Sequence, residues 1–159
     1  MAVGCAHAQS TGNAPVRILV GAPAGGTTDT MARTLAQALG QQLGRVVVVE
    51  NKPGANGTIG FDAAAKAPAD GYTLLLATSS IVLNNQFLYK SLPYDWFKDF
   101  APISMLGIAG QVLVINPNAA IPIKNIKDLV AFAKANPGQI NYGAGAKGNT
   151  AHLTAEKFK

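Results

Sequence analysis

The residues best suited to chemistry in this sequence begin with Gly25, Gly26 and the polar run Thr27–Asp29. Glycine lets the backbone turn without a Cβ penalty and approach a bound group closely. Thr and Asp are residue types that cap helix N-termini. A helix that begins at a glycine turn presents unpaired N–H donors and the positive end of its dipole, which favours an anion. The same stretch also fits an ordinary strand-to-helix connection, and on these residues alone both interpretations stay open.

A second polar stretch, Thr78-Ser79-Ser80, directly follows the apolar run Tyr72–Ala77. Ligands of open α/β sheets bind at the carboxyl ends of the strands, so we expect these hydroxyls to face the same crevice as the first loop. Ser79 is not expected to act as a nucleophile, because no G-x-S-x-G turn surrounds it and no acid is placed to serve His152.

A third loop, Gly143–Gly148, reads G-A-G-A-K-G and matches the dinucleotide fingerprint G-x-G-x-x-G. That fingerprint also needs an acidic residue about 20 positions further on, which lies beyond the last residue of this sequence. Asn149 stands where a phosphate loop would require lysine. A further interpretation pairs this loop with Gly25–Asp29, as two helix N-termini directed at one anion.

Alternating strands and helices are expected to hold these loops. The predicted strands are Val16–Val20, Val46–Val49 and Tyr72–Ala77, and the predicted helices run from about Thr30 to Leu43 and from Thr58 to about Lys66. Met31, Leu35, Leu39 and Leu43, with Ala32 and Ala36 beside them, form the apolar stripe of the first helix. The all-β-branched second strand is typical of one buried on both faces. This order predicts a parallel βαβαβ unit, hence an α/β fold.

The pattern after residue 80 is less regular. Residues 81–100 are expected to hold a satellite cluster of Trp96, Phe97 and Phe100, and residues 101–108 and 111–115 to form strands. Asn125 is a good N-cap for a helix that ends near Asn136. A short strand is predicted at 140–142 and another helix from Thr150.

Composition limits the classes of function. The chain has 159 residues, is 48% hydrophobic and 13% charged, and carries a formal net charge of +5. Its basic residues are scattered and not interleaved with aromatic ones, so a nucleic-acid partner is not expected. One cysteine and two distant histidines exclude an internal disulfide and suggest no metal site.

The first residues resemble the end of an export signal. Ala6-His7-Ala8 has the small-x-small pattern of a signal-peptidase site, although the charged and longer apolar segments of a full signal do not precede it. We therefore interpret residues 1–13 as the remnant of an export signal and a linker. The alternative is a disordered polar N-terminus.

Several motifs together identify a family resemblance. The motifs are A-G-G-x-x-D at 24–29, E-N-K-P-G-A-x-G-x-I-G at 50–60, D-G-Y-T-L-L at 70–75, L-Y-K-x-L-P-Y-D at 88–95, K-D-F-A-P at 98–102, and Asn141-Tyr142 followed by His152-Leu153. In this order the chain closely resembles the Bug family, the extracytoplasmic substrate-binding proteins of tripartite tricarboxylate transporters.

The resemblance implies a non-enzymatic periplasmic binding protein of the type II-like α/β class, a monomer without cofactor. Residues 14–115 would form the first lobe and residues 116–159 the start of a second, incomplete lobe, because the family chain is about twice this long. The ligand would be a small di- or tricarboxylate or a related organic acid, and the partners would be the membrane components of a tripartite transporter.

Carried over by position, the resemblance also implies the ligand contacts. They are Ala24, Gly25, Gly26, Thr27, Thr28 and Asp29 from the first lobe, Thr78, Ser79 and Ser80 beside it, and Gly145, Ala146, Lys147, Gly148, Asn149 and Thr150 from the second. The chain departs from the family at Gly21-Ala22, where Pro-Phe is usual, and at Ala146-Lys147, where Gly-Asn is usual. Lys147 is therefore a candidate selectivity element for ligands with more than one carboxylate.

Two rival functions stay open. The first is a dinucleotide-binding enzyme domain that uses Gly143–Gly148, which should respond to nicotinamide or flavin nucleotides. The second is an interaction module without a small ligand, which should respond neither to nucleotides nor to organic acids.

Overall fold

The computed structural model describes residues 14–118, 121 and 123–159. The predicted signal remnant at 1–13, with Cys5 and His7, lies outside the described residues. The chain divides into two compact units, Met1–Pro102 and Ile103–Lys159. The lobe boundary that we predicted at residue 115 stays a prediction.

A three-stranded parallel sheet forms the centre of the first unit. Its strands are β1 (Val16–Val20), β2 (Val47–Asn51) and β3 (Thr73–Leu76), in the order β2-β1-β3. Both neighbours of β1 pair with it in parallel, with Ile18 opposite Val49 and Leu74. The predicted parallel βαβαβ unit is therefore confirmed.

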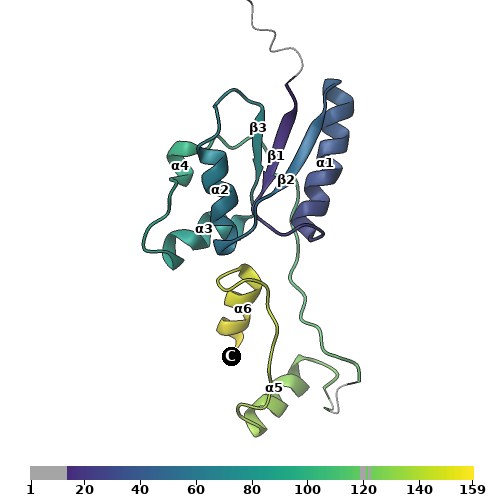
Figure 1. Cartoon of the computed structure of the whole chain (residues 1–159). Helices are drawn as coiled ribbons and strands as arrows, with labels where there is room; N and C mark the ends of the chain where they lie inside the picture. The colour runs from purple at the N-terminus through teal and green to yellow at the C-terminus, as the bar shows by residue number, and fades with distance from the viewer. Residues whose placement is uncertain (1–13, 119–120, 122) are drawn as a thin grey trace, which may run out of the picture. The chain divides into compact units, whose positions relative to one another are not determined.

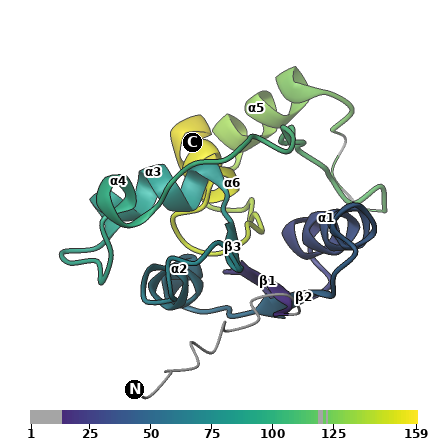
Figure 2. The same ribbon diagram turned by 90° about the horizontal axis from the view of Figure 1, so that it is seen from above.

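Helices α1 (Thr27–Leu43) and α2 (Thr58–Ala65) cover opposite faces of this sheet (Figures 1 and 2). This placement follows from two right-handed crossovers that run in opposite directions along the sheet, from β1 to β2 through α1 and from β2 past β1 to β3 through α2. A short 3₁₀ turn, η2 (Ala55–Gly57), precedes α2. Helix α1 begins three residues before the predicted Thr30 and ends at Gly44, which has the expected left-handed conformation.

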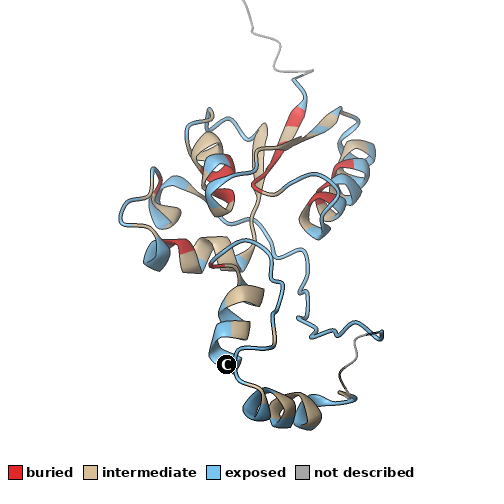
Figure 3. Ribbon diagram, turned by 60° about the horizontal axis from the view of Figure 1, so that its bottom comes forward, coloured by how far each residue is buried: buried red, intermediate tan, exposed pale blue. Residues whose placement is uncertain are grey.

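The core lies along β1 and the inward faces of the two helices, as Figure 3 shows. Ile18, Leu19 and Val20 are at most 1% exposed. On α1 the small residues Ala32 and Ala36 are the buried ones, whereas Leu43, from the predicted stripe, is 51% exposed.

The prediction that the valine run would be buried on both faces was wrong. Val48 is 39% exposed, because β2 is an edge strand of a three-stranded sheet. A β-branched run therefore predicts a strand here but not its place within the sheet.

The sequence analysis did not predict two further helices, α3 (Ser79–Leu88) and α4 (Trp96–Asp99). Behind them, Phe61 of α2 is fully buried against Tyr94, Trp96 and Phe100, with ring centroids 5.3–6.0 Å apart. The predicted cluster therefore exists, but Phe97 is 77% exposed and does not belong to it.

The second unit contains α5 (Ile126–Ala135) and α6 (Thr150–Phe158), both close to their predicted starts. The strands predicted at 101–108, 111–115 and 140–142 were wrong, since the described residues there have no regular structure. A β-strand exists only through hydrogen bonds to a neighbouring strand, and no described strand pairs with these segments. Among the described residues no helix is both long and apolar enough to cross a membrane.

Candidate functional site

The three strands of the first unit end at one level, which brings three loops to one edge of the sheet. Val20, the last residue of β1, pairs with Asn51 at the end of β2 and with Leu76 at the end of β3. The loops that follow are residues 21–26, 52–57 and 77–78. This is the edge where open α/β sheets bind ligands. The first loop and Thr78–Ser80, which we expected at one crevice, therefore both follow this edge.

The helices that leave this edge share uncapped N-termini. Neither the Gly26 cap of α1, the Gly57 cap of α2 nor the Thr78 cap of α3 makes a side-chain capping hydrogen bond. The other three described α-helices, α4, α5 and α6, are capped by Asp95, Asn125 and Asn149 respectively. First-turn N–H groups without a side-chain acceptor are suited to bind an anion.

The first loop corrects one expectation, because Thr27–Asp29 do not cap α1 but form its first turn. Gly26 is the N-cap and has an extended backbone. Because glycine has no side chain, it offers no acceptor to the N–H groups of the first turn. Gly25 has φ +84°, in the left-handed region, so glycine is the residue type that fits this position with the least strain.

The carboxylate of Asp29 is turned back into the protein. It is 3% exposed and accepts hydrogen bonds from Arg33 Nε (3.0 Å), the Gly25 N–H (2.8 Å) and Asn51 Nδ2 (2.9 Å). These donors, Arg33 foremost, lower the pKa of Asp29 to about 2, so it is ionised at neutral pH. An ionised carboxylate only accepts hydrogen bonds, and it therefore has no donor to offer an anionic ligand.

Asn51 and Arg33 complete a closed polar triangle around this carboxylate. Arg33 Nη2 donates to Asn51 Oδ1 at 3.2 Å, and Asn51 Nδ2 also donates to the carbonyl of Ala22 at 3.1 Å. The triangle thus joins the first loop to β2 and α1. Sequence analysis missed both residues, although the i, i+4 spacing of Asp29 and Arg33 is a signal that could have indicated their pairing.

The loop at residues 52–57 is strained and lies close to the loop at residues 21–26. Gly54, Ala55, Asn56 and Gly57 all have positive φ, which for Ala55 costs roughly 1–2 kcal/mol by typical values and for Asn56 less. A Cβ added at Gly21 would lie 2.9 Å from the Gly57 carbonyl oxygen. Position 21, one of the two departures from the resembled family, therefore has no room for a side chain.

The third segment places its hydroxyls at the start of α3. Thr78 is the extended N-cap, and its Oγ1 lies 3.2 Å from Ser80 Oγ within hydrogen-bond reach. Ser79 and Ser80 form the first turn, so their backbone N–H groups belong to the uncapped end.

The third glycine loop lies in the second unit, at the start of α6. Asn149 caps the helix by accepting from the His152 N–H at 2.8 Å, and the Gly148 N–H donates to His152 Nδ1 at 3.2 Å. Lys147 is exposed and Gly148 is buried. The dinucleotide fingerprint requires a strand before its glycines, and the described residues 140–142 form none.

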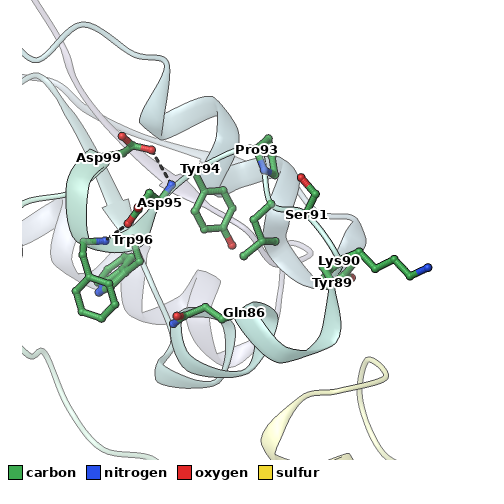
Figure 4. Close-up of a pocket in the computed structure, with 11 residues that line it drawn as sticks. Gln86, Tyr89, Lys90, Ser91, Pro93, Tyr94, Asp95, Trp96 and Asp99 are labelled. Carbon is green, nitrogen blue, oxygen red and sulfur yellow. Dashed lines mark hydrogen bonds between the residues drawn. The ribbon is translucent and has the colours of Figure 1, made fainter.

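A hollow of about 640 Å³ lies elsewhere on the first unit, between the end of α3 and residues 89–99. Figure 4 shows Tyr94 with Gln86, Pro93 and Trp96 near it, whereas the side chain of Lys90 extends away from them. None of the predicted ligand contacts lines it. Among the described residues no group of His, Cys, Asp and Glu could hold a metal ion.

Comparison with known proteins gives a consistent result. The model of the tripartite tricarboxylate transporter family receptor, TctC, matches residues 31–159. Protein BugT of Bordetella pertussis is 45% identical over 146 residues, which are 91% of this chain and 44% of BugT. The chain thus spans about half the length of this curated relative.

Two solved structures share the fold. One, described as a periplasmic transporter, is 41% identical with a TM-score of 0.83, and the match covers 91% of this chain and 48% of that one. The other, Rpa4515 of R. palustris with adipate, is 34% identical with a TM-score of 0.76 over the same shares. These structures, together with the parallel sheet, confirm the predicted α/β fold of the periplasmic-binding class.

Proposed function

The chain belongs to the tripartite tricarboxylate transporter receptor family, and from this premise we propose that it captures a small dicarboxylate or tricarboxylate for uptake. The family consists of periplasmic solute-binding receptors. The proposal places the chain in the periplasm, without catalytic chemistry, delivering its ligand to the membrane components of a tripartite transporter.

One observation carries the proposal: the uncapped N-termini of α1 and α3 begin at the shared end of the three strands. A carboxylate there would accept hydrogen bonds from backbone N–H groups of the first turns, those of Thr27 and Thr28 in α1 and of Ser79 and Ser80 in α3. Such donors are preorganised and need no side-chain charge. Recognition of this kind suits reversible capture, because it involves neither a nucleophile nor a proton acceptor.

The relative solved with adipate supports the class of ligand. Adipate is a flexible chain with a carboxylate at each end, so a site for it has to hold two negative groups. We extend that ligand class to this chain, with the first carboxylate at the sheet edge. Within the predicted site, Gly25 and Gly26 would let the backbone approach the bound carboxylate closely.

Asp29 takes a different role in this proposal from the one the resemblance implied. Its carboxylate is engaged by three donors of the protein itself, so it shapes the loop and does not touch the ligand. For Gly145–Thr150 a ligand contact stays a prediction, with exposed Lys147 as the candidate partner of a second carboxylate.

The dinucleotide alternative has less support. Its loop lacks the preceding strand, and the first turn of α6 is capped by Asn149, so fewer N–H donors remain for a phosphate. The uncapped helix N-termini at the sheet edge argue against an interaction module without a small ligand, because such N–H groups are suited to bind an anion.

Two proline substitutions test the proposal at the backbone. Thr27 is the first residue of α1 and Gly26 before it is extended, with ψ 173°, so proline fits there and removes only one N–H donor. Ser79, preceded by extended Thr78, allows the same change in α3. Thr27→Ala and Ser79→Ala are the matched controls, since they remove the side chains and keep the donors.

The measurement is a titration of the chain with adipate, citrate and NAD, followed by calorimetry and by NMR spectra. We expect binding of the organic acids and none of NAD. Each proline variant should weaken binding roughly ten- to hundredfold, because a hydrogen bond to a charged group contributes about 1.5–3 kcal/mol. Alanine variants should bind nearly as well as the wild type. Equal losses in both variants of a pair would contradict recognition by the backbone.

A further inference from the structure

Asn85, in the middle of α3, is a fully buried amide that the sequence analysis did not single out. It is 0% exposed, and its side-chain hydrogen bonds go to residues just before and at the start of α2. Its oxygen accepts from Asn56 Nδ2 at 2.7 Å, and its Nδ2 donates to the Asn56 carbonyl and to Thr58 Oγ1, both at 3.2 Å. Buried polar groups are usually satisfied in this way, and here the side-chain partners are two residues of one short segment, Asn56 in the loop and Thr58 at the start of α2.

That loop holds two residues other than glycine, Ala55 and Asn56, in the left-handed region. Asn56 has φ 50° and ψ 44°, and Ala55 before it also has a positive φ. The left-handed region suits glycine and, to a lesser degree, Asn, whereas Ala avoids it. The amide of Asn85 holds both the side chain and the carbonyl of Asn56, and so it supplies a contact that offsets the strain.

The position of this loop matters for the sheet edge. Gly57 follows Asn56 directly and packs against Gly21, where the first loop leaves β1. Thr58 is the first residue of α2, and Asn85 itself belongs to α3. One side chain therefore fixes the start of α2 to the helix whose own uncapped N-terminus lies at the same edge.

We propose that Asn85 is a positioning residue of the ligand site, which holds the loop 54–57 and the N-termini of α2 and α3 in one array. This inference rests on the proposed function, since it assigns a role in carboxylate binding to a residue without access to the ligand. The alternative is that Asn85 only stabilises the fold, with no effect on how the edge binds.

The test replaces the amide by an apolar side chain of similar size, Asn85→Leu. Gln86→Leu is the matched control, because the neighbouring Gln86 donates only within its own helix, to the Val82 carbonyl. In ¹H–¹⁵N spectra of the whole chain, Asn85→Leu should shift and broaden the amide signals of Gly54 and Gly57, and Gln86→Leu should leave them in place. Adipate affinity should fall about tenfold for Asn85→Leu only, as expected for lost order at the edge.

A rescue separates positioning from general stability. Glycine adopts the left-handed conformation without support, so Asn56→Gly added to Asn85→Leu should recover much of the adipate affinity. A packing defect inside α3 would not be repaired by a change at residue 56. Recovery of affinity therefore supports the positioning role, and its absence in a folded double variant overturns it.

Each remaining result also decides the question. If Asn85→Leu does not fold, Thr58→Val removes one acceptor of the same amide, and it should displace the Gly57 signal and weaken adipate binding in the same direction. Unchanged glycine signals and unchanged affinity in a folded Asn85→Leu or Thr58→Val would refute the inference. If the wild type binds no dicarboxylate at all, the proposed function fails, while the glycine signals still report whether Asn85 holds the loop.

Discussion

Asn51 Nδ2 lies 2.9 Å from Oδ1 of Asp29, so the last residue of β2 is hydrogen-bonded to the first turn of α1. The same amide nitrogen donates to the Ala22 carbonyl in the first loop. Arg33 closes the group on the other side of the carboxylate. The conformation of the first loop therefore depends on an ionised Asp29, which leads to a prediction about acid.

Stability should depend on the protonation of Asp29 at low pH. Because the pKa of Asp29 falls from an ordinary 3.8 to about 2, its contribution is present above pH 4 and is lost as the pH falls toward 2. Asp29→Asn should lower the unfolding temperature at pH 7 and flatten its decline between pH 4 and pH 2. Circular dichroism melts at several pH values measure both.

In the Asp29→Asn variant, protonation of other carboxyl groups should still lower the unfolding temperature as the pH falls. The pKa of Glu50 is also lowered, by its hydrogen bonds from Arg17, so some acid sensitivity should remain. An Asp29→Asn protein with the same decline as the wild type would show that the polar triangle does not act through its charge.

Phe61 should be a major contributor to the stability of the first unit. It is fully buried, and its ring contacts Tyr94, Trp96 and Phe100. Phe61→Ala should cost about 3–5 kcal/mol of unfolding free energy, the usual range for a buried Phe. Phe97→Ala is the control; because Phe97 is 77% exposed, that variant should stay within about 0.5 kcal/mol of the wild type.

Fluorescence during urea unfolding provides the measurement. Trp96 is the only tryptophan of the sequence and lies 6.0 Å from Phe61 between ring centroids, so its emission reports on this cluster. A Phe61→Ala midpoint equal to that of Phe97→Ala would mean that the aromatic cluster contributes little.

Elements whose formation depends on local sequence were predicted well. The Asn125 cap and the apolar periodicity after it predicted α5 within a residue or so, because helical hydrogen bonds connect near neighbours. The first strand was also predicted at its observed bounds, Val16–Val20, although it forms only by pairing with β2 and β3. The glycine loop between β1 and α1 was likewise visible, since Gly25 does adopt a positive φ.

Features that depend on distant partners could not be predicted in this way. The apolar segment 111–115 has the composition of a strand, but no described strand pairs with it. Asn85 and Asn56 are 29 residues apart, and nothing in their residue types indicates that they form a hydrogen bond with each other. The role of Asp29 likewise emerged only from the positions of Arg33 and Asn51 around it.

Lys147 should discriminate between ligand classes if it faces a second carboxylate. Lys147→Asn is expected to weaken adipate binding up to about fivefold and to leave a monocarboxylate such as propionate unaffected, since an exposed ion pair contributes about 0.2–1 kcal/mol. The difference should shrink at high salt. Lys157→Asn, another exposed lysine, serves as the control in calorimetric titrations. Equal shifts for both ligand classes would mean that Lys147 is no selectivity element.

The sharpest prediction compares two adjacent glycines of the first loop. Gly25 has φ +84°, whereas Gly26 has φ −81° and an extended backbone that any residue adopts. A Cβ at Gly25 would meet nothing within 4 Å, and one at Gly26 would meet only the Pro23 carbonyl oxygen at 3.7 Å. Neither position is crowded, so any difference between substitutions there must come from the backbone.

The cost of a substitution at Gly25 should therefore depend on how readily the new residue adopts the left-handed conformation, and not on the size of its side chain. Ala at this position should cost roughly 1–2 kcal/mol, β-branched Val more, and Asn less than Ala although it is larger. If the loop relaxes instead, the Gly25 N–H loses its hydrogen bond to Asp29 and the first turn of α1 moves. Adipate affinity should then fall in the order Asn, Ala, Val, while Gly26→Ala binds nearly as well as the wild type. Titration of the four variants decides the matter, and losses that track side-chain volume at both glycines would point to a crowded site and against a loop held by its backbone conformation.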